Sequence, residues 1–214
     1  SEIDDSGNFC QIWGVAAYLA THRTIHYPEL QALMKSTVIR EALKKEADFS
    51  KSRPSRRSTD DKTGYFHTVQ QVQRSIVAHF VAEGPNKDFL RDALILEADW
   101  GLGRNPINTI QMTTATTALG SKRSVENIYT SGRDDGTPGL HPGHTPYLNH
   151  NDWSSMIMSR PAWMAAKCYP EFKLWPKAAG YFSTRYVWAH SEFTPQQTMR
   201  GKMALYGYLY GISL

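Results

Sequence analysis

The stretch FLRDALILEADWGLG, residues 89–103, decides the fold class of this chain. Four of its apolar residues recur at intervals of three or four positions: Phe89, Ala93, Leu96 and Trp100. That spacing places them on one face of an α-helix. Gly101 and Gly103 follow directly, and glycine just past the last periodic residue is a common helix stop. The stretch therefore predicts an amphipathic helix that ends in a glycine turn.

Similar periodicity recurs upstream and at the C-terminus. The predicted apolar faces are Phe9, Ile12, Trp13, Ala16, Ala17 and Ala20; Leu30, Leu33, Met34, Val38 and Leu43; Val69, Val72, Ile76, Val77 and Phe80; and Met199, Met203, Tyr206 and Tyr210. A short helix is expected over residues 153–167, and residues 181–189 suit either an extended or a helical form. Because no segment alternates like a half-buried strand, the sequence predicts an all-α fold, with residues 1–214 as a single helical domain.

Two polar stretches separate these helices. Residues 47–64 are charged and are broken by Pro54 and Gly64, so a loop is expected there. Gly84 and Pro85 are expected to end the third helix. Residues 103–152 carry many glycines and prolines together with His, Tyr and Asn, and loops of that length are usually functional or disordered. Their low charge favours an ordered, functional loop.

Composition excludes several functional classes. The net charge is +4 over 214 residues, and the one basic cluster, residues 51–57, suits a solvated loop rather than a nucleic-acid surface. No apolar run approaches the roughly 20 residues of a membrane span. Cys10 and Cys168 make no metal cluster by their spacing. A single disulfide has no framework signature here, and two buried thiols are expected because a free cysteine behaves as a small apolar residue. We therefore expect neither nucleic acid nor membrane as a partner.

Glu192 is the candidate for chemistry. It lies near Trp188, His190 and Phe193, and partial burial among such rings raises the pKa of a carboxyl group enough for it to act as a general acid. The alternative is a capping or surface glutamate before the last helix.

The order of these features resembles the C-terminal half of glycoside hydrolase family 9, the inverting cellulase-like enzymes. Gly103-Arg104-Asn105-Pro106 resembles the family's Gly-x-Asn-Pro, and residues 113–120 resemble its small-residue turn. Ser191-Glu192 stands where the family has an Asn-Glu segment before a closing helix. Residues 140–144, Leu-His-Pro-Gly-His, take the place of its His-rich element but lack the adjacent His-His-Arg. The similarity covers residues 88–214.

This resemblance implies part of an (α/α)6 toroid and an activity on a β-linked glucan or a related polysaccharide. It implies Glu192 as the proton donor, and a secreted or periplasmic location. The residues that it places toward the sugar are Asn105, His141, His144, Tyr147 and Trp188.

One half of the active site is missing from the chain. The family's water-activating aspartates lie in an upstream Asp-Ala-Gly-Asp element, whereas Asp4 and Asp5 are too close to Gly103 and suit a helix cap. The resemblance thus implies that this chain alone is inactive and that its partner is the N-terminal remainder of the catalytic domain. The alternatives are a non-catalytic helical carbohydrate-binding or scaffold fragment, and a helical partner-binding domain.

No cofactor is expected. His141 and His144, with His150 and Asp152 nearby, fit a sugar-lining loop better than a metal site. Residues 133–136, Arg-Asp-Asp-Gly, have oxygen ligands for a structural calcium ion, although a plain turn is the favoured interpretation.

Overall fold

The computed structural model describes residues 11–52, 67–104, 108–113, 123–125, 167, 169–171, 174 and 203–214. Most of these residues are helical, in agreement with the predicted all-α character. In chain order the elements are α1 (Gln11–Leu19), α2 (Pro28–Ser52), α3 (His67–Val81), α4 (Gly84–Gly101), β1 (Thr109–Thr113), β2 (Arg123–Val125) and α8 (Ala204–Ser213).

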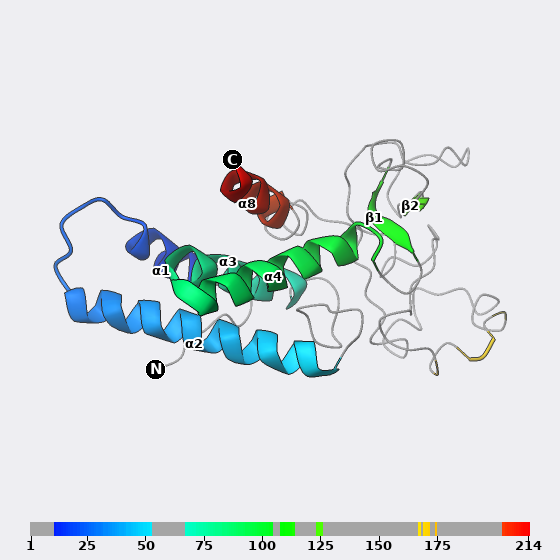
Figure 1. Ribbon diagram of the computed structural model, residues 1–214, viewed down its shortest axis with the longest axis horizontal. Helices are drawn as coiled ribbons and strands as arrows, with labels where there is room; N and C mark the ends of the chain where they lie inside the picture. Colours follow the sequence, from blue (N-terminus) through cyan, green and yellow to red (C-terminus); the bar gives the residue numbers. More distant parts are fainter. Residues whose placement is uncertain are drawn as a thin grey trace.

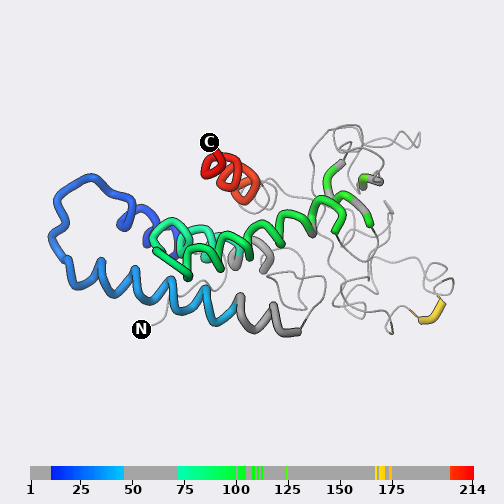
Figure 2. The backbone as a smooth tube through the Cα atoms, viewed as in Figure 1, coloured from blue at the N-terminus to red at the C-terminus, as the bar shows by residue number. Residues whose placement is uncertain are grey.

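The helices pack around α3. The long helix α2 runs along α3 and also touches α4, while the short α1 contacts both α2 and α3. In Figure 1 the C-terminal helix α8 lies on the side of α3 and α4 that faces away from α2, and it contacts both of them. The tube in Figure 2 shows that α4 leads directly from this helical layer to the strand β1. Helix α4 thus connects the helical core with the loop region that the sequence singles out.

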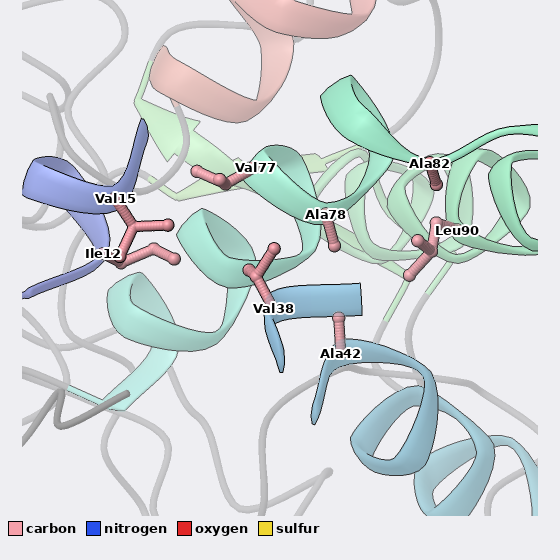
Figure 3. Close-up of a cluster of buried hydrophobic side chains, with 8 residues drawn as sticks. All are labelled: Ile12, Val15, Val38, Ala42, Val77, Ala78, Ala82 and Leu90. Carbon is pink, nitrogen blue, oxygen red and sulfur yellow. The ribbon is translucent and has the colours of Figure 1, made fainter. Parts of the chain in front are cut away.

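The main core lies where α1, α2, α3 and α4 meet (Figure 3). Its buried residues are Ile12, Val15, Val38, Ala42, Val77, Ala78, Ala82 and Leu90. The alanines let the helix backbones approach closely, and each larger aliphatic side chain stabilises the fold by about 1.5–3 kcal/mol through burial. A second cluster, built from Val72, Leu94, Ala98 and Leu205, joins α3 and α4 to α8.

The helices predicted from the five apolar faces exist, but several of their buried faces were predicted incorrectly. In α1, Trp13 is exposed and Val15 is buried. Met203, just before α8, and Tyr210 within it are exposed, while Leu205 is buried. These helices carry apolar residues on more than one face, and the position of neighbouring helices decides which face is covered.

In α4 the buried face is shifted by about one residue along the sequence from the predicted face. Its buried apolar residues are Leu90, Ala93, Leu94 and Ala98. Of the predicted positions Phe89, Ala93 and Leu96, only Ala93 belongs to this set.

One predicted boundary was also wrong. Helix α2 continues to Ser52, through residues 47–52 that were expected to be a loop. Residues 47–52, Ala-Asp-Phe-Ser-Lys-Ser, contain neither glycine nor proline, so nothing local stops the helix before Pro54. Helix α3 ends at Val81, before Gly84 and Pro85 as predicted, and these two residues also begin α4. Proline suits the first turn of a helix because its missing N–H would have no partner there.

The region after residue 103 contains two strands that the sequence pattern did not indicate. Strands β1 and β2 pair in parallel, with Thr109 opposite Arg123 and Ile110 opposite Ser124, and the register shifts before Thr113. Strands of five and three residues are too short to show a reliable alternation. The expected helix over 153–167 lies outside the described residues, apart from position 167, and so do residues 181–189.

Candidate functional site

The Gly-rich turn after α4 is a helix C-cap. The amide of Arg104 donates to the carbonyl oxygen of Asp99 at 2.9 Å, and the amide of Leu102 donates to Ala98 O at 3.0 Å. Gly103, between them, has a φ of 107°, in the region that glycine adopts without strain. This is the Schellman arrangement, in which a glycine reverses the chain and satisfies the last free carbonyls. The predicted helix stop is therefore confirmed.

Arg104 folds back over the helix that it follows. Its Nη2 donates to the carbonyl oxygen of Leu96 at 3.0 Å, and its Nε lies 3.7 Å from Oδ2 of Asp99. A cation at this position opposes the partial negative charge at the helix end, a favourable interaction of about 0.3–1 kcal/mol. The side chain of Arg104 thus holds the turn, and the next residue in the chain is Asn105.

The start of α8 lies against this same end of α4. Leu205 is only 2% exposed and packs with Val72, Leu94 and Ala98. The hydroxyl of Tyr206 donates to the carbonyl oxygen of Ala98 at 3.4 Å. The last turn of α4 and the first turn of α8, more than 100 residues apart in sequence, are therefore in direct contact.

Gly101 is the residue that lets Tyr206 come so close. A Cβ atom built on Gly101 would lie 2.5 Å from the Tyr206 hydroxyl oxygen. Burial raises the pKa of Tyr206, and the nearby charges of Glu97 and Asp99 raise it further. The phenol therefore stays neutral and acts as a hydrogen-bond donor.

A second polar contact joins α8 to α3. Nδ1 of His79 lies 2.6 Å from the hydroxyl oxygen of Tyr208, and the two rings meet edge to face at 85°. His79 is 4% exposed, and its burial, with the charges of Lys87 and Arg91, lowers its pKa. Burial also raises the pKa of Tyr208 to about 12. Both groups are thus neutral at neutral pH, which suits a structural hydrogen bond.

Sequence reasoning missed the roles of His79, Tyr206 and Tyr208. His79 follows Ile76 and Val77 near the apolar face of an amphipathic helix. A histidine buried there needs a hydrogen-bond partner, and this was the available signal. Nothing in the sequence indicated that the partner was Tyr208, 129 residues away.

The predicted site residues lie outside the described part of the chain. They are Glu192, Asn105, His141, His144, Tyr147 and Trp188. Asp4, Asp5, Cys10, Cys168 and residues 133–136 lie outside it as well. The structure instead describes the end of α4 and the start of α8. In the chain, Asn105 follows Arg104 directly, and Glu192 lies 11 positions before Met203.

Within the described ranges, no three His, Cys, Asp or Glu side chains gather as a metal site would require. None of the described helices combines the length and the apolar character needed to cross a membrane. In comparisons with known proteins, neither a family model nor a curated protein matches the chain.

Proposed function

We propose that this chain is the acid-bearing C-terminal portion of an inverting glycoside hydrolase that resembles family 9. Its substrate is a β-linked glucan or a related polysaccharide, and its helices form part of an (α/α)6 toroid. The N-terminal remainder of the catalytic domain supplies the other helices and the catalytic base. The complete enzyme is secreted or periplasmic, where polysaccharides are found.

The contact between α4 and α8 is the observation that supports this proposal best. Tyr206 reaches Ala98 O at 3.4 Å, so the chain arriving from Glu192 enters α8 beside the end of α4. The chain leaving α4 carries Asn105 two positions after Gly103. The two motifs on which the family resemblance depends are therefore joined through the chain to helix ends that contact each other, Asn105 directly after Arg104 and Glu192 11 positions before Met203.

Each residue has a role in the proposed mechanism. Glu192 protonates the leaving oxygen of the scissile bond, while a carboxylate from the N-terminal remainder activates water on the opposite side of the sugar. In an inverting enzyme the two carboxyl groups are about 6.5–9.5 Å apart, which leaves room for that water. Asn105, His141 and His144 hydrogen-bond to sugar hydroxyls. The rings of Tyr147 and Trp188 provide apolar surfaces on which a sugar ring stacks.

The stereochemistry of the product tests the proposal. The full-length protein that contains this chain is incubated with a soluble β-glucan, and the first product is followed by proton NMR. We expect the α-anomer to appear first, because a single displacement by water inverts the anomeric carbon. A β-anomer as the first product would contradict an inverting mechanism. Binding of the glucan without any hydrolysis would support the alternative, a non-catalytic carbohydrate-binding or scaffold role.

The chain by itself is expected to be inactive. A positioned general acid or base contributes about 10²–10⁴-fold to the rate, and the 214-residue chain lacks the Asp-Ala-Gly-Asp element that carries the base in the family. A reducing-sugar assay on the isolated chain therefore serves as the matched control for the full-length protein.

A further inference from the structure

Helix α8 has an exposed apolar side. Residues 203–214, which form the helix and its two flanking positions, contain no charged side chain. Leu205 is buried and packs against α3 and α4, which lie on one side of α8 in Figure 1. A helix that is apolar on all its sides is normally covered on all of them. The outer side of α8 therefore has the character of a surface that meets a partner.

Four residues form one stripe along that outer side: Met203, Gly207, Tyr210 and Leu214, which we call the outer stripe. Their spacing of four, three and four positions places them on one face of a helix. Leu205 lies on the opposite face, since two positions along a helix correspond to a rotation of about 200°. All four residues of the stripe are exposed, Tyr210 by 67% and Leu214 by 90%.

The shape of the outer stripe is complementary to a second copy of itself. Its spacing is the same in both directions, so two copies in antiparallel orientation place Gly207 opposite Tyr210 and Met203 opposite Leu214. A Cβ atom on Gly207 would meet nothing within 4 Å, so the helix surface there is open to the ring of an opposing Tyr210. Paired helices pack in this way, with a large side chain of one helix filling a hole on the other.

The charge of the outer stripe also suits a second copy. In a two-fold symmetric interface the same patch meets itself, so every charged side chain near the axis approaches its own like charge. Such a juxtaposition is strongly unfavourable. Because residues 203–214 carry no charged side chain, two copies of α8 meet without repulsion, and a charged partner would find no opposite charge there.

We propose that the outer stripe of α8 is a self-association surface, on which a second copy of this chain docks its own α8 in antiparallel orientation about a two-fold axis. This inference does not depend on the proposed enzymatic function. The contact is only one short helix long, which belongs to the small, transient class of interfaces. The dimer is therefore weak and depends on concentration.

Sedimentation equilibrium of the full-length protein tests the proposal. The weight-average mass should rise from one copy towards two as the concentration is raised through the micromolar to the millimolar range. Tyr210→Glu places a charge in the middle of the outer stripe and should weaken association by at least about 10-fold, because a buried charge without a partner is unfavourable. Tyr27→Glu is the matched control, since Tyr27 is 61% exposed but precedes α2. It should leave association unchanged.

A second pair of variants tests the antiparallel arrangement. Gly207→Tyr places tyrosine opposite tyrosine and should weaken association by at least about 10-fold through overpacking. The variant that combines Gly207→Tyr with Tyr210→Gly has the original composition and again sets a large residue opposite a small one. It should recover most of the association. Both positions are exposed, and circular dichroism checks that each variant keeps its helical content.

Three results would overturn the proposal. The first is a mass of one copy at every concentration, which would mean that the outer stripe is covered within the same protein or faces solvent. The second is an equal loss of association in Tyr210→Glu and Tyr27→Glu, which would place the contact elsewhere. The third is a failure of the combined variant to recover association, which would exclude the antiparallel pairing of Gly207 with Tyr210.

Discussion

His79 and Tyr208 form a partly buried hydrogen bond, with Nδ1 and the hydroxyl oxygen 2.6 Å apart. The bond connects α3 to the C-terminal helix across 129 positions of sequence. Both groups are neutral, since burial lowers the pKa of His79 and raises that of Tyr208 to about 12. It is therefore a neutral, partly buried hydrogen bond, in which the buried imidazole of His79 would lose this partner at a cost.

Loss of the Tyr208 hydroxyl should destabilise the protein. Tyr208→Phe keeps the ring but leaves Nδ1 of His79 without this partner, and a buried unsatisfied group costs about 1–3 kcal/mol. We expect the free energy of unfolding, measured in urea, to fall by that amount. Tyr210→Phe serves as the control, because the exposed Tyr210 should change it by less than about 0.5 kcal/mol. Equal effects of the two variants would show that the bond contributes nothing.

The lowered pKa of His79 makes stability depend on pH. In the unfolded chain the imidazole titrates near 6.5, whereas in the folded state burial and the charges of Lys87 and Arg91 lower the pKa, partly opposed by Asp88. Between the two values the unfolded state binds more protons, so stability rises with pH. The contribution is complete above pH 6.5 and is lost as the pH falls below that value.

Thermal unfolding at several pH values measures this effect. The melting temperature of the unmodified protein should fall as the pH is lowered from about 7.5 to about 5.5, a range above most carboxylate titrations. His79→Gln should show a smaller dependence because it carries no titrating group there. His26→Gln is the matched control, since His26 is exposed. An unchanged slope in His79→Gln would contradict the assignment.

Two glycines should respond in opposite directions to replacement by alanine. Gly103 has a φ of 107°, so Gly103→Ala strains the turn after α4 and should destabilise the protein by about 1–2 kcal/mol. Gly207 lies within α8, with open space where its Cβ would be. Gly207→Ala should stabilise by about 0.5–1 kcal/mol, because glycine is unfavourable inside a helix. Denaturant titration of both variants measures the two signs, and a shared sign would refute the turn argument.

The sequence predicted where helices exist better than which side of them is buried. Periodicity located α1, α3, α4 and α8 because their apolar spacing is local information. Trp13, on the predicted buried face, is exposed, whereas Val15, which that face did not include, is buried. Both residues belong to apolar stripes of one short helix. The position of α2 and α3 decides between the stripes, and that position depends on distant residues.

Of the features at the end of α4, the turn was predictable from the sequence, whereas the contact with α8 was not. Gly103 indicated the turn after α4 through its type alone, since glycine at that position has a local conformational reason. The closeness of Gly101 to Tyr206 had no such signal. It depends on how α8 meets α4, a contact between residues more than 100 positions apart. Charge-poor, glycine-rich residues 103–152 likewise gave no indication of the strands β1 and β2.

Glu192→Gln in the full-length protein tests the proposed general acid. The substitution keeps the shape of the side chain and removes the transferable proton, so activity on an unactivated β-glucan should fall by about 10²-fold or more. A nitrophenyl glycoside should lose much less, because its leaving group needs little protonation. The melting temperature should hardly change, since a cleft carboxylate contributes within about 0.5 kcal/mol to stability. A capping glutamate would give the reverse result, with a lowered melting temperature and similar relative losses on both substrates. Near-normal cleavage of both substrates would mean that Glu192 is not the acid.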